Sequence, residues 1–346
     1  MMLGRRYRNW FLLSIALGVS CSEKKELVVY ENPVEELQKA DSLLVDSVVS
    51  IVQDRAFVAT DIQIEKALVY QDYTLEDEYP YKDTVRVFQW DKIKERLAYV
   101  ENFQTQNWHY AVLQNYKNRN SEAPTVRNYV RNIYNRVSDT LGVERYQSIP
   151  LYFEHDYLDP IIYARDGSLV RTEKDDTLSM VKVTGISFDG VWDVPKKYIK
   201  FIGDTIRFEK IVVVDVTNQN IATLEKVDSK WLVRSMNPAT TGVQRPPYAQ
   251  KTPTGMFVIQ ESKPKMYYYK DGTTTIEGYA PFASRFTNGA YIHGVPVNNP
   301  KGKMREYSPT LGTVPRSHMC VRNVSSHAEY IYNWAKPLQS LVIVID

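Results

Sequence analysis

A cysteine near the C-terminus and two histidines before it are the residues of this chain best suited to covalent chemistry. Cys320 follows His318 by two positions, and His293 lies 27 positions earlier, at the end of an apolar run. A cysteine attacks as its thiolate, so it needs a base or a positive charge nearby, and the developing oxyanion needs hydrogen-bond donors. The chain therefore contains the parts of a cysteine acyl-transfer site, although a cysteine near a histidine is a weak signal by itself.

Neighbouring blocks make this signal specific. The pair His293-Gly294 is preceded by residues 252–257 (TPTGMF), and a β-branched run leads into a glutamine-containing turn over residues 211–219. Together with residues 317–322 (SHMCVR), these blocks resemble the L,D-transpeptidase catalytic domain, the YkuD-like family, whose signature pairs His-Gly with a later Ser/Thr-His-Gly-Cys. The resemblance covers about residues 208–346 and leaves the N-terminal half of the chain unassigned.

The resemblance implies a role for each residue of the motif. Cys320 would be the nucleophile and His293 its general base, oriented by the backbone carbonyl of Gly294. His318 would lie beside the nucleophile and support the site and its oxyanion donors, with a role as the base the less favoured alternative.

The remaining motif residues would support the substrate and the oxyanion. The backbone N–H of Cys320, together with that of Met319, would donate to the oxyanion, and the Ser317 hydroxyl would fix the turn. Arg322 would either brace the loop or bind a substrate carboxylate, and bracing is the favoured interpretation.

The chain departs from the family pattern at two places. Met319 stands where the family has glycine, which predicts either an ordinary φ or an altered rim of the site. The spacer between the two motif parts is longer than the common form, and we interpret residues 295–315 as an extended loop or lid over the site.

The implied reaction is acyl transfer through a thioester, from a peptidoglycan tetrapeptide stem to an amine acceptor, with cross-links in the cell wall as products. A carbapenem-type inhibitor would acylate the same cysteine. The family needs no cofactor or metal, and the chain shows no motif for either. Two alternatives remain open: an L,D-carboxypeptidase or hydrolase that uses the same cysteine and histidine with water, and an inactive wall-binding lipoprotein.

The first residues predict export. Three arginines precede an apolar run over residues 10–19, which ends in small residues before Cys21. This resembles the lipobox of bacterial lipoproteins, so residues 1–20 are predicted to be a signal peptide, Cys21 to carry lipid, and residues 21–33 to be a tether. The expected location is a bacterial membrane, the outer one, with the protein facing the periplasm.

Charge argues against a nucleic-acid partner. The chain has 43 basic and 41 acidic residues, a formal net charge of +2, which is too even for binding by phosphate neutralisation. With two cysteines nearly the whole chain apart, the fold does not depend on a disulfide framework.

The pattern of apolar and turn residues predicts an α+β fold. A helix-rich N-terminal region of unknown role is expected at 34–207, followed by a β-rich catalytic domain at 208–346 that positions the motif. Helical spacing is expected over 34–67, 90–100 and 126–141, with Gly142 as a C-cap, and strands follow from about residue 146. In the catalytic domain we predict a hairpin over 211–224, strands over 231–234, 256–259, 266–269 and 290–293, a helix over 326–334 opened by a capping box, and a last strand over 341–346.

Overall fold

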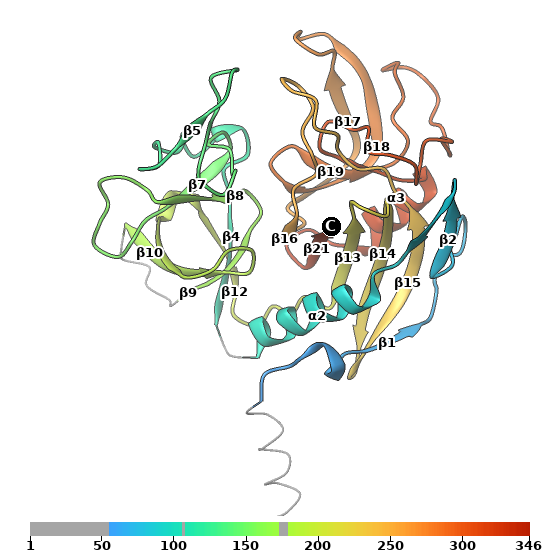
Figure 1. Ribbon diagram of the computed structural model, residues 1–346, viewed down its shortest axis with the longest axis horizontal. Coiled ribbons are helices and arrows are strands. Elements are labelled where there is room, and N and C mark those ends of the chain that lie inside the picture. The colour runs from blue at the N-terminus through green and yellow to red at the C-terminus, as the bar shows by residue number, and fades with distance from the viewer. Residues whose placement is uncertain (1–54, 106–107, 173–178) are drawn as a thin grey trace, which may run out of the picture. The chain divides into compact units, whose positions relative to one another are not determined.

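A six-stranded sheet forms from the apolar runs of the C-terminal part of the chain (Figure 1). The computed structural model describes residues 55–105, 108–172 and 179–346. The strand order is β1-β15-β14-β13-β21-β16, with β1 (Gln63–Lys66), β13 (Lys210–Asp215), β14 (Asn220–Val227), β15 (Lys230–Pro238), β16 (Gly255–Val258) and β21 (Ser340–Ile345). Strand β13 forms the predicted hairpin with β14 and pairs in parallel with β21, so the last strand of the chain lies inside the sheet.

Alternate residues of β13 face two different hydrophobic cores. Ile211 and Val213 join a cluster with buried side chains of α2 (Trp90–Gln104), whereas Val212 and Val214 join one with buried side chains of α3 (Ser325–Trp334). Successive side chains of a strand point to opposite faces of a sheet, and burial on both faces explains why this strand is a continuous β-branched run. The helices predicted over 90–100 and 326–334 are both confirmed.

A four-stranded sheet holds the segments that contain the catalytic motif. Its order is β17-β18-β19-β20, with β17 (Glu261–Tyr269), β18 (Ile276–Thr287), β19 (Ala290–His293) and β20 (Val321–Arg322). Strands β19 and β20 pair in parallel, with Ile292 opposite Val321 and His293 opposite Arg322. This pairing places Cys320, the residue directly before β20, beside β19.

The region before the catalytic motif contains a five-stranded sheet with its own core. Its order is β11-β10-β9-β4-β12, with β4 (His109–Leu113), β9 (Leu169–Thr172), β10 (Met180–Gly185), β11 (Val191–Pro195) and β12 (Ile199–Gly203). The hairpin of β7 (Ser148–Leu151) and β8 (Ile162–Arg165) contributes Ile149, Leu151 and Ala164 to the same core. Residues Ala56–Asp346 form one unit, so this sheet and the two preceding ones belong together.

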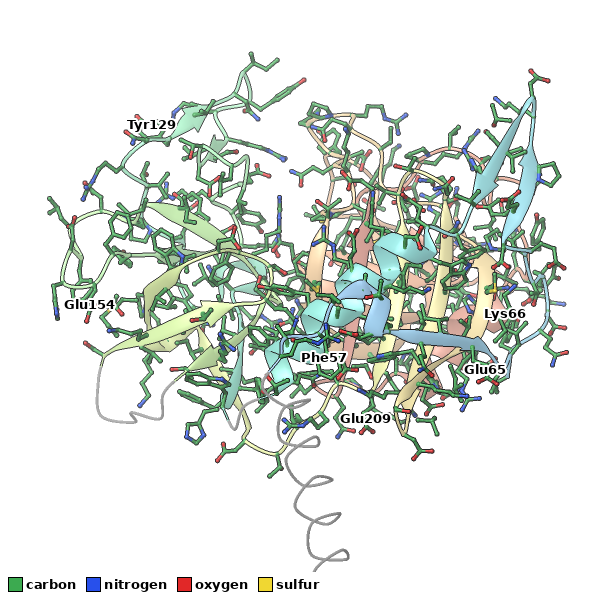
Figure 2. The ribbon with its side chains drawn as sticks, turned by 60° about the horizontal axis from the view of Figure 1, so that its bottom comes forward. Phe57, Glu65, Lys66, Tyr129, Glu154 and Glu209 are labelled. Atoms are coloured by element: carbon green, nitrogen blue, oxygen red, sulfur yellow. The ribbon has the colours of Figure 1, made fainter. Side chains whose placement is uncertain are left out.

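The first strand of the described chain, β1, extends the six-stranded sheet at one edge. Strand β1 pairs in parallel with β15 as an edge strand, and its Glu65 and Lys66 side chains (Figure 2) form ion pairs with Lys230 and Asp77. Charged side chains on an edge strand oppose pairing with another chain.

The remaining elements are η1 (Ala59–Asp61), β2 (Glu78–Tyr81), β3 (Thr84–Val87), η2 (Tyr116–Asn118), β5 (Val130–Arg131), β6 (Val137–Ser138) and η3 (Lys196–Tyr198).

The predicted helix over 126–141 is wrong, and the N-terminal region is not helix-rich. Strands β5 and β6 form a short hairpin there instead, and α2 is the only α-helix among the described residues before 208. Asn132 explains the difference, because its side-chain oxygen accepts the backbone N–H groups of Tyr134 and Arg136, and Asn135 adopts a φ of 60°. Such side-chain bonds stabilise a turn against a helix. Gly142 has a φ of 77° but lies in a turn closed by Asp139, so it caps no helix.

The N-terminus of α3 differs from the prediction. The predicted capping box of α3 is wrong: the helix begins at Ser325, its N-cap is Val324, and no side chain caps it.

The described part of the predicted helix over 34–67 contains η1 and β1, and the signal peptide, Cys21 and the tether lie outside the described residues. In the described part of the chain, no helix is long and apolar enough to cross a membrane.

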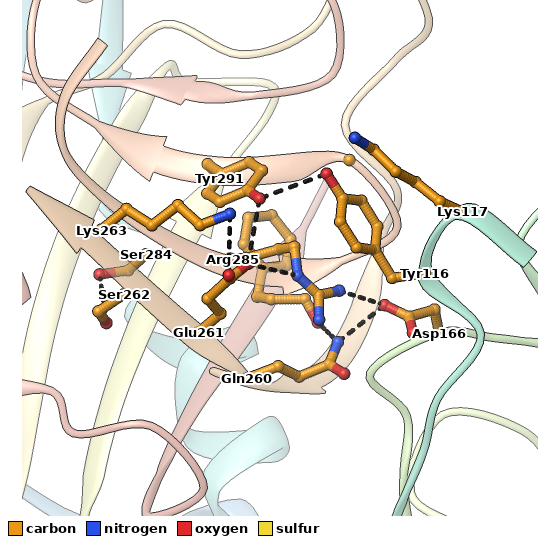
Figure 3. Close-up of polar contacts among 12 residues, drawn as sticks. Tyr116, Lys117, Asp166, Gln260, Glu261, Ser262, Lys263, Ser284, Arg285 and Tyr291 are labelled. Atoms are coloured by element: carbon orange, nitrogen blue, oxygen red, sulfur yellow. Dashed lines mark hydrogen bonds and ion pairs between the residues drawn. The ribbon is translucent and has the colours of Figure 1, made fainter. Parts of the chain in front are cut away.

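A buried polar cluster joins the five-stranded sheet to the four-stranded sheet (Figure 3). Asp166, in the turn between β8 and β9, accepts hydrogen bonds from the Arg285 guanidinium (2.6 Å), the Gln260 side chain (2.8 Å) and the Asn288 backbone N–H (3.1 Å). The Asp166 and Arg285 side chains are 0% and 7% exposed. Next to Asp166, Gly167 has a φ of 89°, and a Cβ there would lie 1.9 Å from the Phe286 carbonyl oxygen, so only glycine allows this approach.

Replacing Asp166 should therefore cost far more stability than replacing a surface carboxylate. Asp166→Asn leaves the buried Arg285 charge with only the more distant Glu261 carboxylate at 3.5 Å, which we expect to cost up to about 3–5 kcal/mol in the free energy of unfolding. Asp156→Asn is the matched control, because Asp156 pairs with Arg127 at the surface with both side chains more than two fifths exposed, and it should change little. Urea denaturation measures both; equal effects of the two substitutions would contradict the assigned role of the cluster.

Candidate active site

Cys320 lies at a cavity of about 470 Å³ on the four-stranded sheet. The other predicted site side chains in its wall are those of His293, Ser317, His318 and Arg322. The thiol is partly exposed, and its Sγ lies 3.6 Å from the carbonyl oxygen of Gly289, in the turn between β18 and β19. The fold thus brings the thiol and the imidazole of His293 to one cavity.

His293 is held in a single tautomer. It is the last residue of β19 and is 3% exposed, and its Nδ1 lies 2.6 Å from the carbonyl oxygen of Gly294. A carbonyl only accepts, so Nδ1 must bear the proton, and Nε2 of the neutral ring is left as an acceptor. Burial lowers the pKa of His293 to about 4; the Gly294 carbonyl opposes this, and the Arg322 charge adds to it. The ring is therefore a neutral base at physiological pH.

The thiol of Cys320 is also neutral in the resting site. Burial raises its pKa above the ordinary value, while the backbone N–H of Tyr291 and the charge of Arg322 act in the opposite direction. Among the described residues, its hydrogen-bond acceptor is Gly289 and not His293. The resting site therefore contains a neutral thiol and a neutral imidazole in the wall of one cavity, and not an ion pair.

The loop that contains Cys320 is fixed by backbone and hydroxyl contacts. The buried Ser317 hydroxyl donates to the carbonyl oxygen of Cys320, as a residue that fixes the turn would. The hydroxyl of Thr252 donates to the Met319 carbonyl (2.7 Å) and accepts the backbone N–H of Gly242 (2.8 Å). One side chain therefore ties the loop of Cys320, the candidate nucleophile, to the segment that runs beside it; we call residues 317–320 the nucleophile loop.

Gln219 extends this support. Its side chain accepts the backbone N–H of Thr241 (2.9 Å) and donates to the Thr241 hydroxyl (2.7 Å), and the Thr241 carbonyl accepts the backbone N–H groups of Arg316 and Ser317. The sequence blocks around Gln219 and Thr252 were recognisable as motif, but their role was not. Gln219 lies in a polar turn and Thr252 in a proline-containing loop, so no local sequence signal indicates that both side chains are buried.

Met319 adopts a strained backbone conformation. Its φ is 105°, which rules out the ordinary φ considered for a non-glycine residue here. A backbone of this kind costs on the order of 1–3 kcal/mol and persists only where its surroundings enforce it. Gly242 is part of that enforcement, because a Cβ on it would lie 2.7 Å from the Met319 Cα and 2.3 Å from the Gln250 carbonyl oxygen.

His318 lies at the rim of the cavity. Its side chain is 44% exposed, and its Nδ1 is 3.5 Å from a carboxylate oxygen of Asp271, in the turn that follows β17. Within the described chain, its polar contact is with Asp271 and not with the thiol.

Arg322 lines the cavity, is largely buried and has no carboxylate partner in the described chain. Its Nε is buried and has no hydrogen-bond partner among the described residues, and burial lowers its pKa. The backbone of Arg322, and not its side chain, braces the loop, through a pair of hydrogen bonds with Thr240. The side chain is thus available to an anionic ligand.

The long spacer forms one wall of the cavity. Residues of 295–315 that line it are Val295, Pro296, Asn298, Arg305, Tyr307, Ser308, Pro309, Thr310 and Leu311. The spacer is anchored: the Ser325 hydroxyl donates to the Arg305 carbonyl (2.6 Å), and the Arg86 guanidinium, from β3, donates to the Gly312 and Thr313 carbonyls. These contacts hold the spacer in place as one wall of the cavity.

His327, to which the sequence assigned no role, is a buried structural residue. Its Nε2 lies 2.8 Å from the Ser235 hydroxyl, and burial lowers its pKa to about 3. It lies in α3 and does not line the cavity of Cys320.

The comparisons with known proteins agree with the motif. Residues 209–344 match the family model of the YkuD L,D-transpeptidase catalytic domain, so the resemblance predicted from the sequence is confirmed over that range. The chain matches no curated protein sequence.

Solved structures give weak similarities. A fused Zn-dependent amidase/peptidase/peptidoglycan-binding protein from Clostridium acetobutylicum is 18% identical over 39% of this chain, which spans 51% of that protein, with a TM-score of 0.29. An L,D-transpeptidase from Mycobacterium tuberculosis H37Rv is 18% identical, over 57% of this chain and 77% of that one, with a TM-score of 0.33. L,D-transpeptidase 3 from Mycobacterium tuberculosis, in complex with a faropenem-derived adduct, is 17% identical, over 53% and 93%, with a TM-score of 0.33.

Arg322 should set the reactivity of the thiol. Because its charge lowers the pKa of Cys320, Arg322→Gln should raise that pKa further and slow alkylation by iodoacetamide at neutral pH. In the unsubstituted protein the alkylation rate should still be rising above pH 8.5, the ordinary thiol pKa being about 8.5.

The control for this measurement is Lys301→Gln, on the spacer but outside the cavity wall, which should leave the alkylation profile unchanged. A thiol that is fully ionised at pH 7 would contradict the neutral resting state.

Proposed function

We propose that this protein is a peptidoglycan L,D-transpeptidase that transfers an acyl group through a thioester on Cys320. The observation that supports this most strongly is the placement of His293, whose Nδ1 proton is bound by the Gly294 carbonyl, in the cavity wall that also contains the Cys320 thiol. That arrangement leaves one nitrogen lone pair as a base toward the space a substrate would fill.

In the first half-reaction Cys320 attacks the carbonyl carbon of the third residue of a tetrapeptide stem, an L centre. The thiol proton passes to Nε2 of His293 as the carbon–sulfur bond forms. The backbone N–H groups of Cys320 and Met319 donate to the oxyanion. The carbon–nitrogen bond to the terminal D-Ala then breaks, and that amine leaves with the proton from His293.

In the second half-reaction an amine of another stem attacks the thioester carbonyl. His293 accepts a proton from the attacking nitrogen, the carbon–sulfur bond breaks, and the sulfur recovers the proton as a thiol. The product joins the third residues of two stems, and the enzyme returns to its neutral resting pair. Throughout, the Nδ1–H bond to Gly294 keeps Nε2 in place and stabilises the imidazolium between the two transfers.

Arg322 supplies recognition in this scheme. It lines the cavity without a carboxylate partner among the described residues, so a stem carboxylate would satisfy it. Of the two roles predicted for Arg322, this proposal assigns carboxylate binding to its side chain.

Export and anchoring complete the proposal. The signal peptide and Cys21 would place the enzyme on the outer membrane, facing the periplasm and the wall that it modifies.

The first test is acylation by a carbapenem. The mature protein incubated with imipenem should gain the whole mass of the drug on Cys320, because opening the β-lactam ring releases no fragment. Cys320→Ala should show no adduct and nearly the same thermal midpoint, and His293→Gln should slow acylation by about 10²–10⁴-fold. Intact-mass spectrometry measures the adduct; a wild-type protein without one would contradict the proposal.

The acceptor is tested separately with a disaccharide-tetrapeptide as sole substrate. A transpeptidase produces a cross-linked dimer and free D-Ala, whereas a carboxypeptidase produces only the tripeptide and D-Ala. Product masses distinguish the two, and tripeptide alone would replace the transferase with the hydrolase.

A further inference from the structure

Two adjoining cavities lie outside the one that contains Cys320. Their volumes are about 620 and about 1210 Å³, and both are lined by Arg131, Arg136, Glu144 and Gln250. One wall comes from the segment of β5 and β6, and the other from the segment 241–254 that supports the nucleophile loop. We call the two together the basic groove.

Basic side chains exceed acidic ones in the basic groove. Its lining includes five arginines or lysines, Arg131, Arg136, Arg145, Arg165 and Lys251. Its acidic lining residues are three, Glu122, Glu144 and Asp346. Because the whole chain is nearly neutral, this excess is a local feature that favours an anionic ligand.

Two of the three acids of the groove, Glu144 and Glu122, are already engaged. Glu144 pairs with Arg136 (3.3 Å) and accepts from the Gln250 side chain (2.6 Å), and Glu122 pairs with Arg145 (3.3 Å). These contacts leave the other basic residues of the groove without a carboxylate.

Arg165 is a largely buried cation of the basic groove without an ion-pair partner among the described residues. It lies at the end of β8, and its guanidinium forms no ion pair or hydrogen bond with the described residues. The nearby Asp139 carboxylate accepts the backbone N–H groups of Leu141, Val143 and Tyr163, and it and Glu144 act on the Arg165 charge without a direct contact. A desolvated cation without a partner is costly in the empty site, so an anion in the groove would be bound with a large gain.

Arg131 and Lys251 add two further free charges. The Arg131 side chain bonds only to Asn135 and stacks near the Tyr129 ring, and Lys251 is exposed without an ion pair among the described residues. Exposed tyrosines of the same walls, Tyr134, Tyr146 and Tyr248, are 43–54% exposed and offer flat faces for a peptide or a sugar ring.

The basic groove reaches the back of the nucleophile loop. The smaller cavity is lined by Gly289, His318 and Met319, and the Gly289 carbonyl accepts the Cys320 thiol. His318 lines both this cavity and the one that holds Cys320. A ligand in the groove therefore ends beside the position of the thioester.

We infer that the basic groove binds the acceptor, a second peptidoglycan stem whose carboxylates contact Arg131, Arg165 and Lys251 while its amine approaches the thioester. The inference rests on the proposed function and assigns a role to the N-terminal region, which the family resemblance does not cover. It makes recognition of the acceptor separable from acylation of Cys320.

The test compares the two half-reactions in matched variants. Arg131→Gln and Lys251→Gln should each raise the KM for the acceptor stem about tenfold, since each removes a charge-assisted contact, and should leave the rate of acylation by imipenem unchanged. Arg127→Gln is the control, because Arg127 lies near Arg131 in sequence but pairs with Asp156 outside the groove, and it should change neither quantity. An unchanged acceptor KM in both groove variants, or an equal rise in the control, would overturn the inference.

A binding measurement separates this inference from the proposed function. In the imipenem-acylated protein the cavity of Cys320 is filled, so calorimetric titration with a disaccharide-tetrapeptide reports the groove, and the groove variants should bind about tenfold more weakly than the control. If no acyl-enzyme forms, the proposed function fails, and the same titration of the Cys320→Ala protein still tests the groove. Equal affinity in all variants would place the stem elsewhere.

Discussion

The arrangement at the site depends on one buried hydrogen bond, between Nδ1 of His293 and the carbonyl oxygen of Gly294. Burial alone would only make the ring neutral, and the carbonyl decides which nitrogen keeps the proton. Since the carbonyl belongs to the next residue of the chain, the direction of the backbone after β19 determines the direction of the base. The parallel pairing of β19 with β20 then brings the thiol to the same cavity. A local backbone contact and one strand pairing thus define the chemistry that is possible.

The loop of Cys320 shows how the rest of the fold supports this constraint. Met319 is held at a positive φ that a methionine would not choose, and the strain is maintained by the Thr252 hydroxyl and by the tight approach of Gly242. The cluster around Asp166 fixes the turn that precedes β19 from the other side, through the backbone N–H of Asn288. Residues far apart in sequence therefore converge on a few backbone atoms near the sulfur.

Much of the catalytic part followed from the sequence, because its strands and helices are encoded by local patterns. The β-branched run at Ile211 and the apolar spacing of α2 each predicted the correct element, and the motif located Cys320 and His293. The helix predicted over 126–141 failed because the apolar spacing there is genuine but the side-chain bonds of Asn132 favour a turn. Contacts between distant segments, such as those of Gln219, Asp166 and the unpaired Arg165, leave no periodic trace and needed the structure.

The proposed base depends on which nitrogen of His293 bears the proton, and ¹⁵N nuclear magnetic resonance of histidine-labelled protein measures this directly. The His293 signals should report a proton on Nδ1 and an unprotonated Nε2 at neutral pH. Because burial lowers the pKa of His293 to about 4, that state should persist to pH 5, where an exposed histidine is charged. A proton on Nε2 at neutral pH, or a ring that becomes charged near pH 6.5, would show that the base described here does not exist.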